Sequence, residues 1–178
     1  MLLRILNTTL FFIRSSAAAL LFVFTFVYES FAQDTTALLI IKNVPIVIGS
    51  INDRPAYFLI DTGASITMLN ESLGATYGFE VVYNKYFAKG RIAGMGGRSV
   101  LREARDVRIK LGIHELNFIN KAANFDSISA MFADDDIIIA GIIGADLLYL
   151  LGSRIDLGLG IIVFKPNKPV NRLDLSRK

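Results

Sequence analysis

The chain has 178 residues, of which 53% are hydrophobic, and a formal net charge of +3. This length allows one domain with a sizeable core, and so small a charge predicts no nucleic-acid partner. The absence of cysteine excludes disulfides, thiolate nucleophiles and cysteine-based zinc sites. The single histidine, His114, excludes a multi-histidine metal site, and no Gly-x-Ser-x-Gly motif is present to pair with it. Carboxylates must therefore carry any acid–base chemistry.

Residues 1–32 have the features of a secretory signal peptide. Two arginines and no acid lie in the first 14 residues, an apolar run follows over 17–27, and Ser30 and Ala32 offer the small residues of a cleavage site before Gln33. We expect a periplasmic or secreted protein that meets the membrane only transiently, through this segment. The alternative is an uncleaved signal anchor, in which Arg14 would cost about 2.5–3.5 kcal/mol near the helix centre.

The rest of the chain is predicted to form one all-β domain over 36–166 and a polar tail over 167–178. Turn residues over 50–55 predict a hairpin. Asn70 is a candidate N-cap of a short helix that ends at Gly78, and residues 146–151 are predicted to form a second short helix. Alternating and β-branched runs predict strands over 37–42, 44–48, 56–60, 86–92, 99–111, 115–120, 137–140, 155–157 and 161–164.

The strongest candidate for a catalytic acid is Asp61, which follows the predicted strand 56–60. The sequence Asp61-Thr62-Gly63-Ala64 would lift a carboxylate from a rigid strand into a tight loop, and Gly63 permits conformations that a Cβ would forbid. The alternative is that Asp61 only caps a turn.

Two further segments accompany this loop. The first is a glycine-rich stretch, which is either a flap or only a hairpin tip, and it contains Ile92, Gly94, Met95, Gly96 and Gly97. The second consists of Ile142, Ile143 and Gly144, followed by the predicted short helix.

In this order and spacing, the three segments resemble those of the retropepsin-like aspartic peptidases, over about Ile40 to Phe164. The resemblance implies a closed β-barrel with a flap hairpin, endopeptidase activity on polypeptide substrates, and no metal or organic cofactor. It also implies a homodimer in which the two Asp61 carboxyl groups together activate a water molecule. The two groups would share one proton, because two carboxyl groups about 3 Å apart cannot both be ionised. Thr62 would hold the loop across the dimer interface, and the Gly63 carbonyl would align the substrate.

The sequence departs from the viral members of that family at two linked positions. They carry an acid two positions after the glycine of the active-site loop and an arginine directly after the second-segment glycine, where this chain has Ser65 and Ala145. Both partners of that ion pair are missing together, so no unpaired charge is left buried.

Two alternative functions use the same fold without catalysis. A silent module could hold an extended peptide by strand addition, and a weakly dimeric scaffold could serve as an interaction protein. Asp146 is expected to be structural, at the start of its helix, and the acidic run 134–136 is expected to be a solvated turn.

Overall fold

The computed structural model describes residues 34–85, 91–94 and 97–165. The predicted signal segment, the predicted tail, and Met95 and Gly96 at the tip of the predicted flap lie outside these residues. Within these three ranges, no helix has the length and apolar character needed to cross a membrane.

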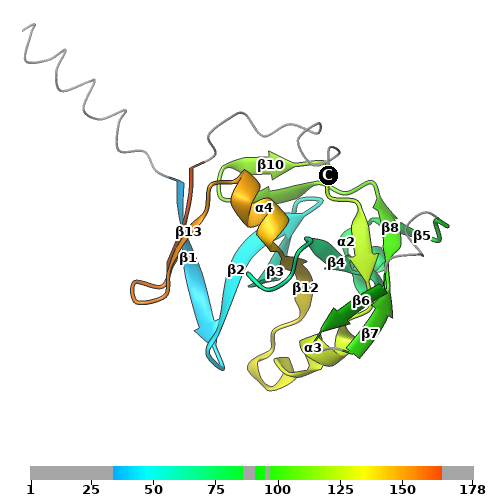
Figure 1. Cartoon of the computed structure of the whole chain (residues 1–178), viewed down its shortest axis with the longest axis horizontal. Coiled ribbons are helices and arrows are strands. Elements are labelled where there is room, and N and C mark those ends of the chain that lie inside the picture. The colour runs from blue at the N-terminus through cyan, green and yellow to red at the C-terminus, as the bar shows by residue number, and fades with distance from the viewer. Residues whose placement is uncertain (1–33, 86–90, 95–96, 166–178) are drawn as a thin grey trace, which may run out of the picture. The chain divides into compact units, whose positions relative to one another are not determined.

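Strands dominate the described chain, and its helices are short (Figure 1). Twelve strands form one sheet, whose main path runs β13-β14-β1-β2-β3-β12-β4-β11-β8-β5, while β9 pairs with β2 and β10. The strands are β1 (Asp34–Ile41), β2 (Val44–Ile51), β3 (Arg54–Ile60), β4 (Met68–Asn70), β5 (Glu80–Val82), β6 (Arg91–Gly94), β7 (Gly97–Val100), β8 (Arg102–Arg105), β9 (Ile109–Leu111), β10 (His114–Leu116), β11 (Lys121–Ala123), β12 (Ile139–Ile143), β13 (Arg154–Asp156) and β14 (Ile161–Phe164). The helices are η1 (Glu71–Leu73), α2 (Gly74–Tyr77), α3 (Asp126–Ala130), η2 (Ala133–Asp135) and α4 (Ala145–Leu150).

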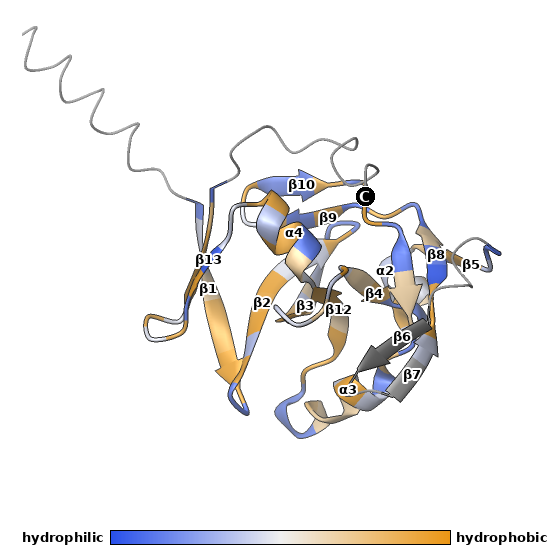
Figure 2. Cartoon of the chain, in the orientation of Figure 1, coloured by the Kyte–Doolittle hydropathy of each residue, from blue (hydrophilic) through white to orange (hydrophobic). Residues whose placement is uncertain are grey.

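The pair formed by β3 and β12 lies at the centre of the path and is parallel. Phe58, Ile60 and Ile143 belong to one buried apolar cluster, whereas Leu59 and Ile142 belong to another. Successive side chains along a strand point to opposite faces, so alternate residues of the two strands supply the two clusters. The hydrophobic colour accordingly follows these strands, and the hydrophilic colour marks connections such as the turn between β1 and β2 (Figure 2). Burial on both faces explains why β12, and β3 from Ala56 onward, have continuous apolar sequences.

The all-β class with a few short helices is confirmed. Closure into a barrel stays a prediction, because the pairings of the described strands leave β13 and β5 as the ends of the path. The strand predicted over 99–111 was wrong as one element. It is divided into β7, β8 and β9, and Asp106 between the last two has a positive φ of 58°. The sequence analysis did not predict α3. It predicted a strand over 115–120, whereas the structure has β10 at His114–Leu116.

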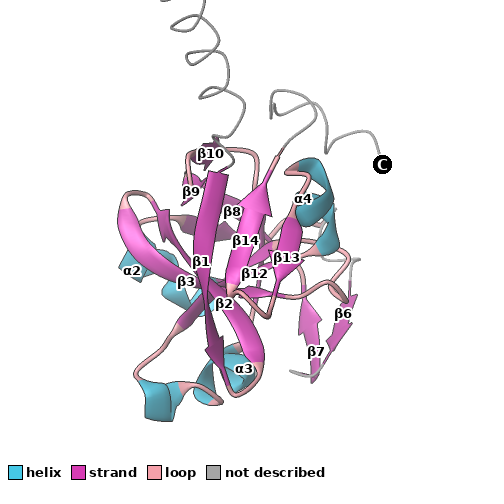
Figure 3. Cartoon of the chain, turned by 90° about the vertical axis from the view of Figure 1, so that its left-hand side faces the viewer, coloured by secondary structure: helices cyan, strands magenta, loops and turns pink. Residues whose placement is uncertain are grey.

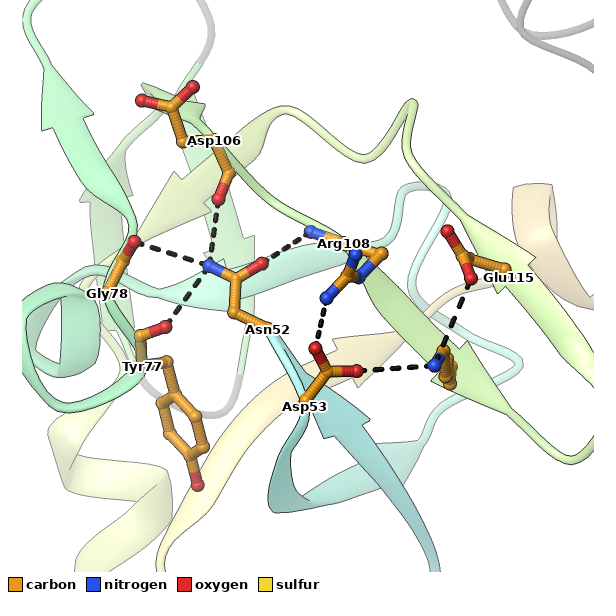
Figure 4. A network of polar contacts seen from close by, with 8 residues as sticks. Asn52, Asp53, Tyr77, Gly78, Asp106, Arg108 and Glu115 are labelled. Atoms are coloured by element: carbon orange, nitrogen blue, oxygen red, sulfur yellow. Dashed lines mark hydrogen bonds and ion pairs between the residues drawn. The ribbon is translucent and has the colours of Figure 1, made fainter.

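The β2–β3 hairpin turn is fixed to distant segments by the side chain of Asn52 (Figure 4). Its Nδ2 lies 3.1, 3.2 and 2.8 Å from the carbonyl oxygens of Tyr77, Gly78 and Asp106, and its Oδ1 accepts a hydrogen bond from the Arg108 amide at 2.9 Å. Asn52 has a φ of 49°, a conformation that asparagine tolerates better than most residues. One side chain thus ties the hairpin that leads into Asp61 to the end of α2 and to the β8–β9 connection.

The next residue of the same turn adds charge pairs at the surface. The Asp53 carboxylate contacts the Arg108 guanidinium and lies 3.2 Å from Lys110 Nζ (Figure 4). The hydrogen bond from Lys110 is the largest cause that lowers the pKa of Asp53. Because Asp53 is exposed, water and salt screen these pairs and they contribute little to stability.

We predict that Asn52→Gly lowers the free energy of unfolding by about 1–3 kcal/mol, because it keeps the positive φ but removes the side-chain hydrogen bonds. Urea denaturation measures this difference. Asn43→Gly is the matched control, since Asn43 also has a positive φ in a hairpin turn, 63°, but its side chain makes no hydrogen bond to the described residues. Equal losses in the two variants would show that the hydrogen bonds of Asn52 contribute nothing.

Candidate active site

Asp61 directly follows β3, at the point where the chain leaves the sheet. Its Oδ1 accepts hydrogen bonds from the backbone amides of Gly63, at 2.8 Å, and Ala64, at 3.2 Å. A Cβ on Gly63 would lie 3.1 Å from the same oxygen, tighter than most contacts of this kind. The loop therefore fixes the orientation of the carboxylate, while Asp61 itself stays half-buried and Thr62 and Gly63 are exposed.

The second predicted segment lies against this loop. The Asp61 amide donates to the carbonyl of Ile143 at 3.0 Å, and the Ala145 amide donates to the carbonyl of Ala64 at 2.7 Å. Between these two hydrogen bonds, a Cβ on Gly144 would lie 2.6 Å from the carbonyl of Ile66, so only glycine fits without a backbone shift. The structure thus brings together two segments that are about 80 residues apart in the sequence.

A third link between the two segments comes from Thr67, which sequence reasoning did not identify. Thr67 is 3% exposed, and its Oγ1 accepts a hydrogen bond from the Gly144 amide at 3.0 Å and donates one to Asp146 Oδ1 at 2.7 Å. Asp146 Oδ1 also accepts from the Leu147 amide at 2.7 Å, at the start of α4. Asp146 therefore has the structural role expected of it, and it also anchors Thr67. The one signal for Thr67 in the sequence was a hydroxyl within the apolar run Ile66–Leu69.

The predicted flap residues lie in a separate two-stranded sheet, formed by β6 and β7. Ile92 pairs with Ser99, and Gly94 pairs with Gly97, while the predicted flap residues Met95 and Gly96 lie outside the described residues. The Ser99 hydroxyl accepts a hydrogen bond from the Asn124 amide at 3.1 Å. This contact joins the base of the hairpin to the segment between β11 and α3.

A polar network holds the end of β4, the strand that leaves the Asp61 loop. Asp126 accepts hydrogen bonds from the Ser72 hydroxyl at 2.6 Å and from the side-chain amides of Asn70, at 3.0 Å, and Asn124, at 3.1 Å. The hydrogen bond from Ser72 is the largest of the causes that lower the pKa of Asp126. Asn70 also caps η1, as predicted, by accepting the Ser72 amide.

The other polar residues considered from the sequence have partners other than Asp61. His114 lies in β10; its Nε2 lies 3.2 Å from Asp34 Oδ2 and its ring meets Phe164 edge-on. Of the acidic run 134–136, Asp135 pairs with Lys42 at 3.0 Å. Among the described residues, no group of three or more histidine and acidic side chains could hold a metal ion.

The chain was compared with known families, curated sequences and solved structures. The family model for aspartyl proteases matches residues 47–147, more than half of the chain. No curated protein sequence matches the chain significantly. Among solved structures, the EIAV protease complexed with the inhibitor HBY-793 is similar, with 23% identity and a TM-score of 0.45, over 65% of this chain and 95% of that one.

Two further solved structures are similar at a comparable level. A retropepsin-like aspartic protease from Rickettsia conorii has 17% identity and a TM-score of 0.45, over 75% of this chain and 90% of its own. The retroviral protease-like domain of Ddi1 from Leishmania major has 19% identity and a TM-score of 0.41, over 76% and 98%.

We predict that Thr67→Val lowers the free energy of unfolding by about 1–3 kcal/mol, because valine keeps the shape but leaves the buried Gly144 amide without its acceptor. Chemical denaturation measures the loss, and Thr67→Ser, which keeps the hydroxyl, is the control. A valine variant as stable as the serine variant would contradict the role assigned to this hydroxyl.

Proposed function

The chain belongs to the aspartyl protease family, and we propose that it is an aspartic endopeptidase that acts on polypeptides as a homodimer, with one Asp61 from each chain. The observation that carries this proposal is the Asp61 loop. A carboxylate at the end of a buried strand is oriented by two backbone amides, and the backbone of its loop packs closely against Gly144. A carboxylate that only caps a turn would not need the second segment to be fixed behind it.

The two oxygens of the Asp61 carboxylate have different environments. Oδ1 accepts both amide hydrogen bonds, whereas Oδ2 accepts none from the described residues. Oδ2 is therefore available to a water molecule and to a second carboxylate. In the proposed reaction, the ionised member of the Asp61 pair takes a proton from water, the water oxygen attacks the peptide carbonyl carbon, and the protonated member donates its proton to the carbonyl oxygen.

One chain supplies one such carboxylate. The only similar string in the sequence, Asp156-Leu157-Gly158, begins at the last residue of the short edge strand β13, and Asp156 Oδ1 accepts the Leu159 amide within a turn. That aspartate caps a turn between strands and lies outside the central pair. The exposure of Thr62 and Gly63 is consistent with contacts to a second chain and to substrate.

We also propose that the protein is exported and that cleavage occurs before Gln33. In support, all of the described strands lie at or after Asp34, so removal of residues 1–32 would take away none of them.

We predict that Asp61→Asn lowers peptidase activity by a factor of about 100 or more, because an amide cannot accept the proton of the attacking water. Folding should persist, since the asparagine oxygen can still accept the amides of Gly63 and Ala64. Cleavage of unfolded casein, with and without a pepstatin-type inhibitor, measures the activity. Asp134→Asn, in the exposed run far along the chain, is the matched control and should retain full activity.

Near-native activity of Asp61→Asn would show that Asp61 is not the catalytic acid. If the wild-type protein binds unfolded casein but does not cleave it at any pH between about 3 and 8, the protein is a peptide-binding module and not a peptidase.

A further inference from the structure

The β6–β7 hairpin, which the sequence predicts to be a flap, forms a two-stranded sheet of its own beside the main sheet (Figure 3). Its two strands pair with each other, so contacts at its base help to set where the hairpin lies. Ser99 on β7 makes such a contact, because its hydroxyl accepts a hydrogen bond from the Asn124 backbone amide at 3.1 Å. Whatever fixes Asn124 therefore also fixes the base of the hairpin.

Asn124 is fixed by Asp126. Its Nδ2 donates to Asp126 Oδ2 at 3.1 Å, and its Oδ1 accepts the Asp126 backbone amide at 3.2 Å. The other carboxylate oxygen, Asp126 Oδ1, accepts hydrogen bonds from Asn70 Nδ2 at 3.0 Å and from the Ser72 hydroxyl at 2.6 Å. The two oxygens of one carboxylate thus hold two different segments. Oδ2 holds the segment that meets the hairpin, and Oδ1 holds the segment that follows the Asp61 loop.

The segment held by Oδ1 belongs to the central strands. Asn70 is 1% exposed and is the last residue of β4, which pairs with β11 and with β12. Strand β12 leads directly into Gly144, whose close contact with Ile66 places the Asp61 loop. Asp126 therefore connects the base of the hairpin to the strands that carry the candidate active site.

We propose that Asp126 is a positioning residue of the peptidase: its carboxylate sets the place of the β6–β7 hairpin relative to Asp61, and substrate binds less tightly when Asp126 is neutral. The proposal deepens the proposed function and rests on it, because it takes the hairpin to be part of the substrate site. Hydrogen bonds to an ionised carboxylate are about twice as strong as those between neutral groups. The side-chain amide nitrogens of Asn70 and Asn124 cannot accept a proton, so protonation of Asp126 weakens its contacts on both sides.

The environment of Asp126 keeps it ionised to lower pH than an ordinary aspartate. The hydrogen bond from Ser72 is the largest cause that lowers the pKa of Asp126, and those from Asn70 and Asn124 act in the same direction against desolvation. Because the pKa in the folded chain is lowered, the contacts are fully present above the pKa of the unfolded chain. They are lost as the pH falls through the lowered pKa of the folded chain.

Charged groups on the neighbouring elements do not set this titration. Those elements carry Glu71 on η1, Lys121 on β11 and Arg98 on β7. Glu71 pairs with Arg102 at 2.7 Å. Among the described side chains, no charged group contributes to the pKa shift of Asp126, which comes from neutral donors and desolvation. Removal of one neutral donor is therefore a clean way to move the pH at which Asp126 titrates.

The first test separates substrate binding from chemistry. We expect Asp126→Asn to raise KM by about three- to tenfold and to change kcat by less than about twofold, because the variant loses the charge that ties the hairpin but keeps Asp61. Ser99→Ala, which removes the acceptor of the Asn124 amide, should have the same effect. Asp134→Asn makes the same chemical change in the exposed run after α3, and its KM should equal that of the wild type.

The second test is the pH profile of KM. As the pH falls, KM should begin to rise at a higher pH in Ser72→Ala than in the wild type, because this variant lacks the hydrogen bond that lowers the pKa of Asp126 most. In Asp126→Asn, KM should not show this rise. A Ser72→Ala profile that coincides with that of the wild type, or an Asp126→Asn variant with wild-type KM at every pH, would overturn the proposal.

The third test does not depend on catalysis. Hydrogen exchange of the Asn124 backbone amide, followed by NMR without substrate, should be about three- to tenfold faster in Asp126→Asn and in Ser99→Ala than in the wild type. Equal exchange in all three proteins would show that Asp126 does not fix the hairpin base. If exchange becomes faster as expected but the wild-type protein cleaves no polypeptide, the proposed peptidase is contradicted, while the link from Asp126 to the hairpin base is supported.

Discussion

The arrangement of the Asp61 site depends on the close contact between Gly144 and the backbone of Ile66. The 2.6 Å distance from a Cβ on Gly144 to the Ile66 carbonyl leaves room for glycine alone, and this close approach lets Asp61, Ala64 and Thr67 reach the segment after β12. The parallel pairing of β3 with β12 then sets the direction in which Asp61 leaves the sheet. Because both strands are buried on both faces, a local change in the loop would have to move packed side chains of two clusters. The orientation of the Asp61 carboxylate is therefore fixed by the sheet and its two cores as well as by the loop.

The polar groups around the loop are few and satisfied. Thr67 and Asn70 are the buried polar residues of the described chain, and each has hydrogen-bond partners on distant segments. Viral members of the family have an acid at one position near the loop and an arginine at another. This chain has Ser65 and Ala145 there, and both are exposed. The hydroxyl–carboxylate contact between Thr67 and Asp146 joins the same two segments within one chain. Contacts within one chain therefore hold the Asp61 loop in place.

The sequence was most informative where structure is set by neighbouring residues. The β2–β3 hairpin, the cap at Asn70, the helix end at Gly78 and the position of Asp61 after a strand were predicted from local patterns, and the structure has them. The failures have a common physical cause. Asp106, with its positive φ, interrupts the alternating pattern of 99–111, and the strands on its two sides, β8 and β9, pair with different partners. Helix α3 is short, and it is held by the Phe125 carbonyl and by the contacts of Asp126 with Asn70 and Ser72. Partners so far apart in the sequence cannot be identified from a single sequence, and for the same reason Thr67 was missed.

The central claim is that one chain is incomplete and that two Asp61 carboxylates form the site. The most direct test follows specific peptidase activity and sedimentation over the same dilution series of the purified protein. The account predicts that specific activity rises with protein concentration and levels off where the dimer predominates, because only the dimer holds both carboxylates. Constant specific activity from a species that sediments as a monomer throughout would contradict it.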